Sequence, residues 1–214
     1  MPMTLYCHPL ASYCHKVLIA LYESGVAFTP RHVNLGDAQD AAAFKAVWPL
    51  GKFPVLDEDG RIVPESTTII EYLAARHPAA AALIPREAEA AFAARAADRF
   101  FDLHVHNMMQ TIIGDRLRPA DKKDAFGVAQ SRAALTTALG IADRQIAGRR
   151  FAGGDGFTIA DCAALPPLFY CDLAVTPLAP DYPALAAYLA RMKERPSYAR
   201  TLAEAQPYMH LVPR

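Results

Sequence analysis

The feature that most constrains the fold of this chain is a change of rhythm at His77-Pro78. Before this point, short apolar runs typical of strands alternate with stretches in which apolar residues recur at helical spacing. The expected order over residues 1–77 is β-α-β-α-β-β-α. Parallel strands joined by helices, followed by a hairpin, predict a small mixed sheet with helices on its faces.

Local signals place the elements of this first half. Gly25 suits the end of the first helix, and Asp57–Gly60 suits the turn of the hairpin. Strands are predicted at residues 3–7, 27–33, 54–56 and 61–63, and helices at 12–24, 38–47 and 66–76.

The second half shows no convincing strand pattern, which predicts an all-helical domain. Asp124 is expected in the first turn of one helix, and Thr158–Asp161 reads as a capping box. We expect one domain over residues 1–80 and a second over 86–214, with Pro78–Pro85 as the linker. Helices are predicted over 87–117, 121–147, 157–172, 184–194 and 197–205.

Composition argues against several classes of function. Lysine plus arginine and aspartate plus glutamate number 22 each, so a basic surface for nucleic acid has little support. No apolar run reaches the roughly 18 residues of a membrane span, and no secretory segment leads the chain. Hydrophobic residues make up 53%, enough for a sizeable core. We expect a cytoplasmic protein with reduced cysteines that binds neither nucleic acid nor membrane.

The stretch CHPLASYCHKV, residues 7–17, concentrates two cysteines and two histidines. Cys7 and Cys14 are too far apart for a C-x-x-C redox pair, and a zinc site would need a second clustered pair, so no metal is predicted. In a dithiol enzyme the attacking cysteine would stand at Ala11, which has no nucleophile. The segment has the position of a thiol site without its attacking thiol.

Four motifs, in order along nearly the whole chain, resemble the cytosolic glutathione transferase superfamily. They are the opening with Pro9, Ser12 and Lys16-Val17, then GKFPVL at 51–56, ESTTIIEYL at 65–73 and FTIAD at 157–161. The resemblance implies an N-terminal α/β thioredoxin-like domain (βαβαββα) followed by an all-α helical bundle. It also implies glutathione as co-substrate and a homodimer.

A glutathione site is implied at the matching positions. Phe53-Pro54 is expected to be a cis bond that turns a sheet edge, so that Val55 N–H and C=O bind the cysteinyl backbone of the ligand. Ser66, with its N–H, is expected to hold the γ-glutamyl carboxylate, although a plain N-cap role would also explain a serine there. The remaining implied contacts are Glu65 with the ammonium and Lys52 with the glycyl carboxylate. Lys52 could equally be a solvated surface lysine with no binding role.

The ligand thiol needs help to ionise. Lowering a thiol pKa from about 8.5 by two units takes roughly 2.7 kcal/mol. A hydrogen bond to the charged sulfur supplies about 1.5–3 kcal/mol, and a helix amino end adds about 0.3–2 kcal/mol. Ser12, at the head of the first predicted helix, is the favoured source of both. Tyr13, backbone N–H groups and Cys7 stay open as alternatives, because Ala11 breaks the pattern and leaves zeta-, theta- and beta-like features mixed.

The acceptor pocket is expected to draw on the long helix after the linker. His106 is the candidate that lines the pocket near the sulfur; the alternative is that His106 is a core or surface histidine with no role in binding. The other predicted acceptor residues are Leu10, Tyr13, Asn107 and Gln110.

The resulting prediction is a glutathione transferase of the detoxification type that attacks a small hydrophobic electrophile or a peroxide. A glutathione-dependent cis-trans isomerase, similar to maleylacetoacetate isomerase, is the first alternative. A non-catalytic glutathione-binding scaffold follows, motivated by Ala11. A disulfide reductase comes last, because Cys14 occupies the resolving and not the attacking position.

Overall fold

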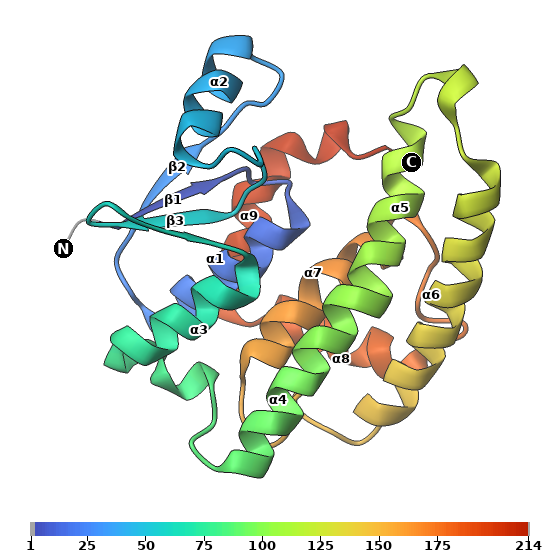
Figure 1. The fold of residues 1–214 in the computed structure, drawn as a ribbon. Coiled ribbons are helices and arrows are strands. Elements are labelled where there is room, and N and C mark those ends of the chain that lie inside the picture. Colours follow the sequence, from blue (N-terminus) through green and yellow to red (C-terminus); the bar gives the residue numbers. More distant parts are fainter. Residues whose placement is uncertain (1–2, 214) are drawn as a thin grey trace. The chain divides into compact units, whose positions relative to one another are not determined.

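The computed structural model describes residues 3–213 and divides into two compact units, which we treat separately (Figure 1). The first unit runs to Ile84 and takes in Pro196–Met209, and the second holds Pro85–Arg195 and the residues from His210 onward. The second domain expected from the sequence spans 86–214, whereas the structure groups 196–209 with the first unit.

Within residues 3–213, four strands form one mixed sheet in the order β2-β1-β3-β4 (Figure 1). Strand β1 runs parallel to β2, and β3 runs antiparallel to both β1 and β4. The predicted order βαβαββα and the predicted fold class are confirmed. The strands are β1 (Met3–Cys7), β2 (Thr29–His32), β3 (Val55–Glu58) and β4 (Arg61–Pro64).

Helices cover both faces of this sheet. Helix α2 (Ala38–Val47) lies on one face, where Phe44 stacks on Tyr6 with ring centroids 5.7 Å apart. Figure 1 shows α1 (Ser12–Ser24) and α3 (Ser66–Arg76) on the other face. Buried and partly buried side chains alternate along β1, because successive side chains of a strand point to opposite faces of the sheet.

The first helix begins and ends where the sequence predicts. It starts at Ser12, and Gly25 follows it in the left-handed conformation with φ of 67°, which a glycine adopts without steric cost. Its interior is almost wholly buried, and Lys16, fully buried, donates from Nζ to Thr67 Oγ1 at 2.8 Å. This bond ties α1 to the first turn of α3.

Helix α9 (Pro196–Ala205) packs against α1 through polar contacts that the apolar pattern of the sequence does not reveal. The Tyr22 hydroxyl donates to Glu204 at 2.6 Å, and Ser197 donates to Glu23 at 2.7 Å. These bonds explain why the last helix belongs to the first unit.

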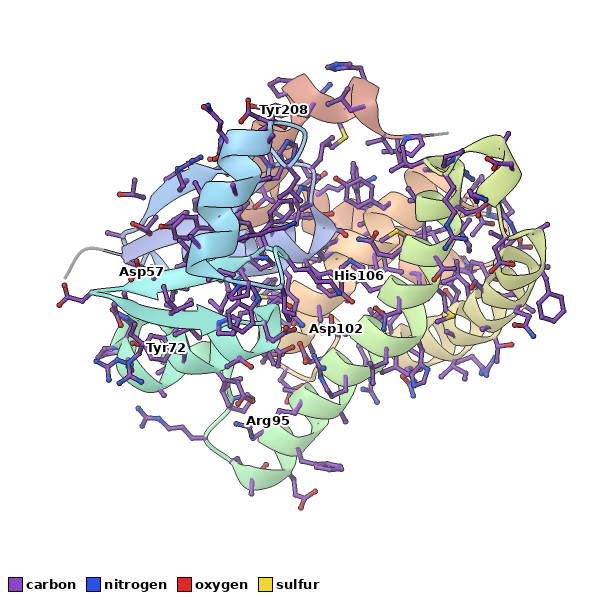
Figure 2. The ribbon with its side chains drawn as sticks, turned by 45° about the horizontal axis from the view of Figure 1, so that its top comes forward. Asp57, Tyr72, Arg95, Asp102, His106 and Tyr208 are labelled. Atoms are coloured by element: carbon purple, nitrogen blue, oxygen red, sulfur yellow. The ribbon has the colours of Figure 1, made fainter. Side chains whose placement is uncertain are left out.

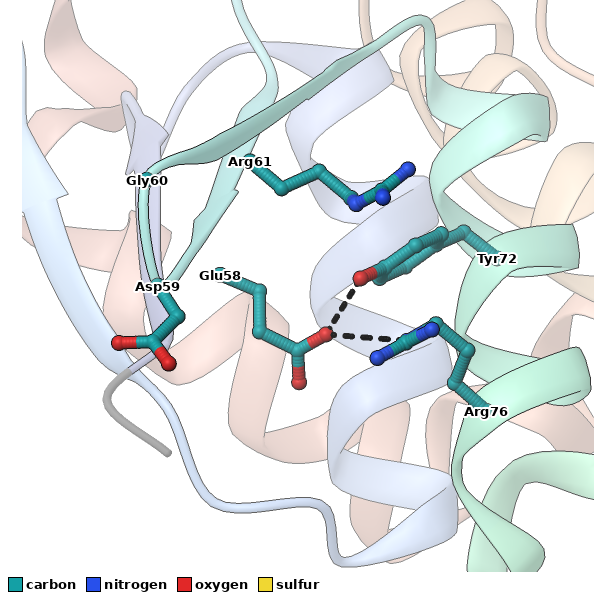
Figure 3. A pocket seen from close by; sticks show the side chains of 6 residues that line it. All are labelled: Glu58, Asp59, Gly60, Arg61, Tyr72 and Arg76. Carbon is teal, nitrogen blue, oxygen red and sulfur yellow. Dashed lines mark hydrogen bonds and ion pairs between the residues drawn. The ribbon is translucent and has the colours of Figure 1, made fainter.

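The predicted linker is folded. Pro78–Leu83 forms the 3₁₀ helix η1, with Ala80 and Leu83 buried. The carboxylate of Glu58, the last residue of β3, meets side chains from α3 and its C-cap (Figure 3). It accepts a hydrogen bond from Tyr72 at 2.5 Å and pairs with His77 Nε2 at 2.9 Å and Arg76 Nε at 3.5 Å. A cavity of about 490 Å³ opens beside this network.

The second unit is helical. Its elements are α4 (Ala88–Phe100), the π-helical segment η2 (Phe101–His106), α5 (Asn107–Arg116), η3 (Ala120–Lys122), α6 (Ala125–Ile146), α7 (Ile159–Ala174) and α8 (Pro183–Lys193). The helix predicted to begin at residue 121 begins instead at Ala125, because Asp124 is its N-cap and accepts from Gly127 N. None of the helices described, within 3–213, is long and apolar enough to cross a membrane.

The predicted capping box at the start of α7 is confirmed. Thr158 accepts from Ala160 N, and Asp161 accepts from Thr158 N at 3.0 Å. Asp161 is fully buried and also accepts from Ala152 N and from the Tyr188 hydroxyl, each at 2.8 Å. The box therefore also fixes the preceding loop and α8.

Candidate active site

The sheet register brings three predicted site segments to one end of the first unit. Tyr6 pairs with Val55 in antiparallel strands, so the end of β1 lies beside the start of β3. Val55 pairs in turn with Pro64, the last residue of β4. The loop 8–11, the segment 52–54 and the turn at 65–66 therefore leave the sheet at the same end.

The loop 8–11 delivers Ser12 to the first position of α1. Ala11 is the N-cap without a side-chain bond, and its carbonyl accepts from the N–H groups of Cys14 and His15. The N–H groups of Ser12 and Tyr13 belong to the first helical turn, where the helix dipole favours a negative charge. Ser12 itself is buried, with 3% exposure.

Two histidines hold this loop, and sequence reasoning had assigned a role to neither. His15, fully buried in α1, directs Nε2 at the carbonyl of Pro9 at 2.5 Å. Burial lowers the pKa of His15 to about 4, so the ring is neutral at physiological pH. At the mouth of the loop, His8 Nδ1 accepts from the N–H of Leu10 at 3.2 Å. His8 and His15 therefore anchor the loop between β1 and α1.

The predicted cis bond at Phe53-Pro54 is confirmed. The expectation that Val55 lies on an open sheet edge was wrong, because β3 lies between β1 and β4 and Val55 is fully buried. Phe53 precedes the strand and is half-buried, with its ring 6.1 Å from that of Phe44. Phe53, unlike Val55, lies outside the strand ladder.

At the third segment, Glu65 and not Ser66 is the N-cap of α3, so the simple capping explanation of Ser66 does not apply. Glu65 has φ of 68°, a left-handed conformation that is uncommon for a non-glycine residue. Such outliers cluster at binding and active sites. Ser66 is 7% exposed and opens the helix, whereas Glu65 and Lys52 are exposed.

The protein's own thiols are poorly suited to chemistry. All four cysteines are buried and reduced. Burial raises the pKa of Cys7 to about 12 and the pKa of Cys14 well above its usual range. Because the thiolate is the nucleophile, neither group is activated.

In the second unit, the predicted acceptor residues divide between interior and surface. His106, at the end of η2, is fully buried, whereas Asn107 and Gln110 are exposed. Figure 2 labels His106 and Asp102 on this segment, and Asp102, 5% exposed, pairs with Arg99. The sequence suggested a continuous α-helix here; a π-helical segment instead interrupts it, a feature frequent at functional sites.

Both units match known domain families. Residues 5–81 match the glutathione S-transferase N-terminal domain, and residues 125–191 match the glutathione S-transferase C-terminal domain. This chain belongs to the glutathione S-transferase family.

Individual relatives span nearly the full chain. It is 30% identical to a probable maleylacetoacetate isomerase of Caenorhabditis elegans over 95% of this chain and 94% of that protein. It is 28% identical to a maleylpyruvate isomerase of Ralstonia, over 96% and 99% of the two chains. A crystal structure of a glutathione S-transferase from Methylobacillus flagellatus with GSH (glutathione) bound is similar with a TM-score of 0.85 and 28% identity, covering 93% and 98%.

Proposed function

We propose that this chain is a glutathione transferase, which binds glutathione at the sheet end of its first unit and directs the thiolate at a small hydrophobic electrophile or a peroxide. The observation that carries the proposal is the convergence of the segments at 8–12, 52–54 and 65–66, each suited to one part of the tripeptide. Family membership supports the choice of ligand.

Each end of glutathione finds a complementary group in this arrangement. The backbone of Phe53 pairs with the cysteinyl backbone as a one-residue strand addition. The Ser66 hydroxyl and the N–H groups at the start of α3 hold the γ-glutamyl carboxylate. The Glu65 carboxylate binds the ammonium, and Lys52 meets the glycyl carboxylate. The strained backbone of Glu65 supports a binding role for this turn.

The thiol is activated at the head of α1. Its proton leaves to solvent, and the Ser12 hydroxyl donates a hydrogen bond to the resulting thiolate, which the helix amino end also stabilises. The sulfur then attacks an electrophilic carbon, a C–S bond forms, and the leaving group departs with its bonding pair. The acceptor residues Leu10, Tyr13, His106, Asn107 and Gln110 stay predictions from the sequence.

A glutathione-dependent isomerase is the second candidate, favoured by relatives that carry isomerase names. In this reaction the thiolate adds to a conjugated cis double bond, rotation follows about the resulting single bond, and the thiolate leaves. Glutathione is regenerated, so its concentration distinguishes this reaction from conjugation.

Calorimetric titration with glutathione tests the shared premise. We expect saturable binding to the folded protein. No binding at millimolar concentration would refute both the transferase and the isomerase proposals. Turnover of a chloronitroarene with loss of glutathione supports the transferase, and turnover of a cis-enone without loss supports the isomerase.

Substitution of Ser12 then separates catalysis from scaffolding. We expect Ser12→Ala to bind glutathione but to lose about tenfold or more in turnover, because a hydrogen bond to a charged group contributes about 1.5–3 kcal/mol. An unchanged rate would remove Ser12 from the mechanism. If the wild type binds glutathione but turns over neither substrate above buffer, the non-catalytic scaffold replaces the enzyme.

We further propose that the protein acts in the cytoplasm as a homodimer with a role in detoxification. Light scattering is expected to give twice the chain mass of 23.3 kDa. A mass near that of one chain would refute the dimer.

A further inference from the structure

His8 contacts two of the three segments that converge at the sheet end. Its Nδ1 accepts the N–H of Leu10 at 3.2 Å, inside the loop that leads to Ser12. Its ring is nearly parallel to that of Phe53, with centroids 6.3 Å apart and an interplanar angle of 21°. One imidazole therefore bears on the loop before α1 and on the segment before β3.

A third contact restrains the same ring. Tyr208, in the 3₁₀ helix η4 (Gln206–Leu211), meets His8 edge-on with centroids 5.3 Å apart. Tyr208 belongs to the first unit, and Figure 2 labels it at the start of that terminal segment. With Phe53 on its face and Tyr208 at an edge contact, the imidazole has little freedom to turn away from Leu10.

We propose that His8 is a positioning residue of the glutathione site, and that its two functions are separable. Its Nδ1 sets the loop that presents Ser12 to the thiol, and its ring sets Phe53, whose backbone receives the cysteinyl part of the ligand. The inference rests on the proposed function, since it assigns His8 a task in that same site.

The acceptor role requires a neutral ring, because a protonated Nδ1 donates and cannot accept the Leu10 N–H. Burial and the nearby His32 lower the pKa of His8, which favours the neutral form. The His8 ring contacts the Phe53 ring and the Tyr208 phenol. The exposed His32 acts on the pKa of His8 through electrostatic repulsion.

Two substitutions separate the functions. His8→Asn keeps an acceptor, because an asparagine side chain readily accepts from the N–H two residues on, but it removes the ring. His8→Phe keeps a ring against Phe53 but removes the acceptor. The readouts are the dissociation constant for glutathione, by calorimetry, and the thiolate fraction of bound glutathione at fixed pH, by ultraviolet absorbance. Neither readout requires a known acceptor substrate.

We expect opposite losses. His8→Asn should weaken glutathione binding about fivefold with the thiolate fraction retained, and His8→Phe should lower the thiolate fraction about fivefold with binding nearly retained. The same substitutions at the exposed His104 serve as controls and should match the wild type. Circular dichroism verifies that each variant is folded.

The possible results test the positioning role of His8 separately from the proposed function. If the wild type binds glutathione and both His8 variants match it, the positioning role is overturned and the proposed function stands. Equal losses of both quantities in both variants also overturn it, because a merely structural histidine would give that result. If the wild type binds no glutathione, the proposed function and this inference both fail.

Discussion

Acid should destabilise this protein through one buried side chain, His15. The ring is fully buried in α1, and burial lowers its pKa to about 4 despite the Pro9 carbonyl and the negative charge of Glu204. In the unfolded chain the same group titrates near 6.5, so the two states differ by about 2.5 pKa units. At about 1.4 kcal/mol per unit, the difference corresponds to about 3 kcal/mol of stability.

The sign follows from which state binds the proton. The folded pKa is depressed, so below about pH 6.5 the unfolded chain takes up a proton that the folded chain resists. The contribution of His15 is therefore complete above pH 6.5, falls as the pH drops towards 4, and changes little below that.

Urea unfolding, followed by tryptophan fluorescence, measures this effect. The single tryptophan, Trp48, packs against the cluster around Phe44 in the first unit, so its emission reports on the domain that contains His15. Carboxylates also titrate over this range, and the matched variant His15→Gln cancels their contribution while keeping a donor for the Pro9 carbonyl. We expect the wild type to lose about 3 kcal/mol more than the variant between pH 7 and 4. Equal losses in the two proteins would show that burial does not depress the pKa of His15.

Three further predictions concern the stability and reactivity of the fold. Asp161→Asn should cost about 2–4 kcal/mol in urea unfolding, because one acceptor of a buried, fully bonded carboxylate becomes a donor; a change below about 0.5 kcal/mol would contradict this. Tyr72→Phe should cost about 1–2 kcal/mol by removing a donor from the buried Glu58, and an unchanged midpoint would show that solvent replaces it. The four buried thiols should resist Ellman's reagent in the native state and react after unfolding; rapid native reaction would contradict their burial.

Much of the architecture could be predicted because local signals and tertiary packing agree. The helices at 38–47 and 66–76 begin and end where predicted, and so does the first helix with its terminal glycine. Apolar spacing, a left-handed C-terminal glycine and polar caps are all local features, and the sequence displays them directly. The cis bond came from the resemblance, not from any local pattern.

The misses have a common origin in interactions between residues far apart in sequence. Assignment of the last helix to the first unit depends on bonds such as Tyr22 with Glu204, which span most of the chain. The interior position of Val55 depends on the order of the strands in the sheet, which the residues around Val55 do not reveal. The π-helical segment at Phe101–His106 has no signature that apolar spacing detects.

Part of the candidate site could not be predicted from the sequence either. Ser12, Phe53 and Ser66 were predicted from the motif resemblance, and their roles stay predictions. For His8 and His15 the sequence offers only a metal site to weigh, and none is predicted. Their contacts with Leu10, Phe53 and the Pro9 carbonyl become visible once the loop is built. A histidine two residues before a loop N–H was the one available hint.

A crystal structure of the protein with glutathione bound tests the central claim most directly. We expect the cysteinyl backbone against Phe53, the γ-glutamyl carboxylate at the start of α3 beside Ser66, and the sulfur within hydrogen-bonding reach of the Ser12 hydroxyl. A tripeptide absent from this end of the sheet, or a sulfur turned away from residues 10–14, would contradict it.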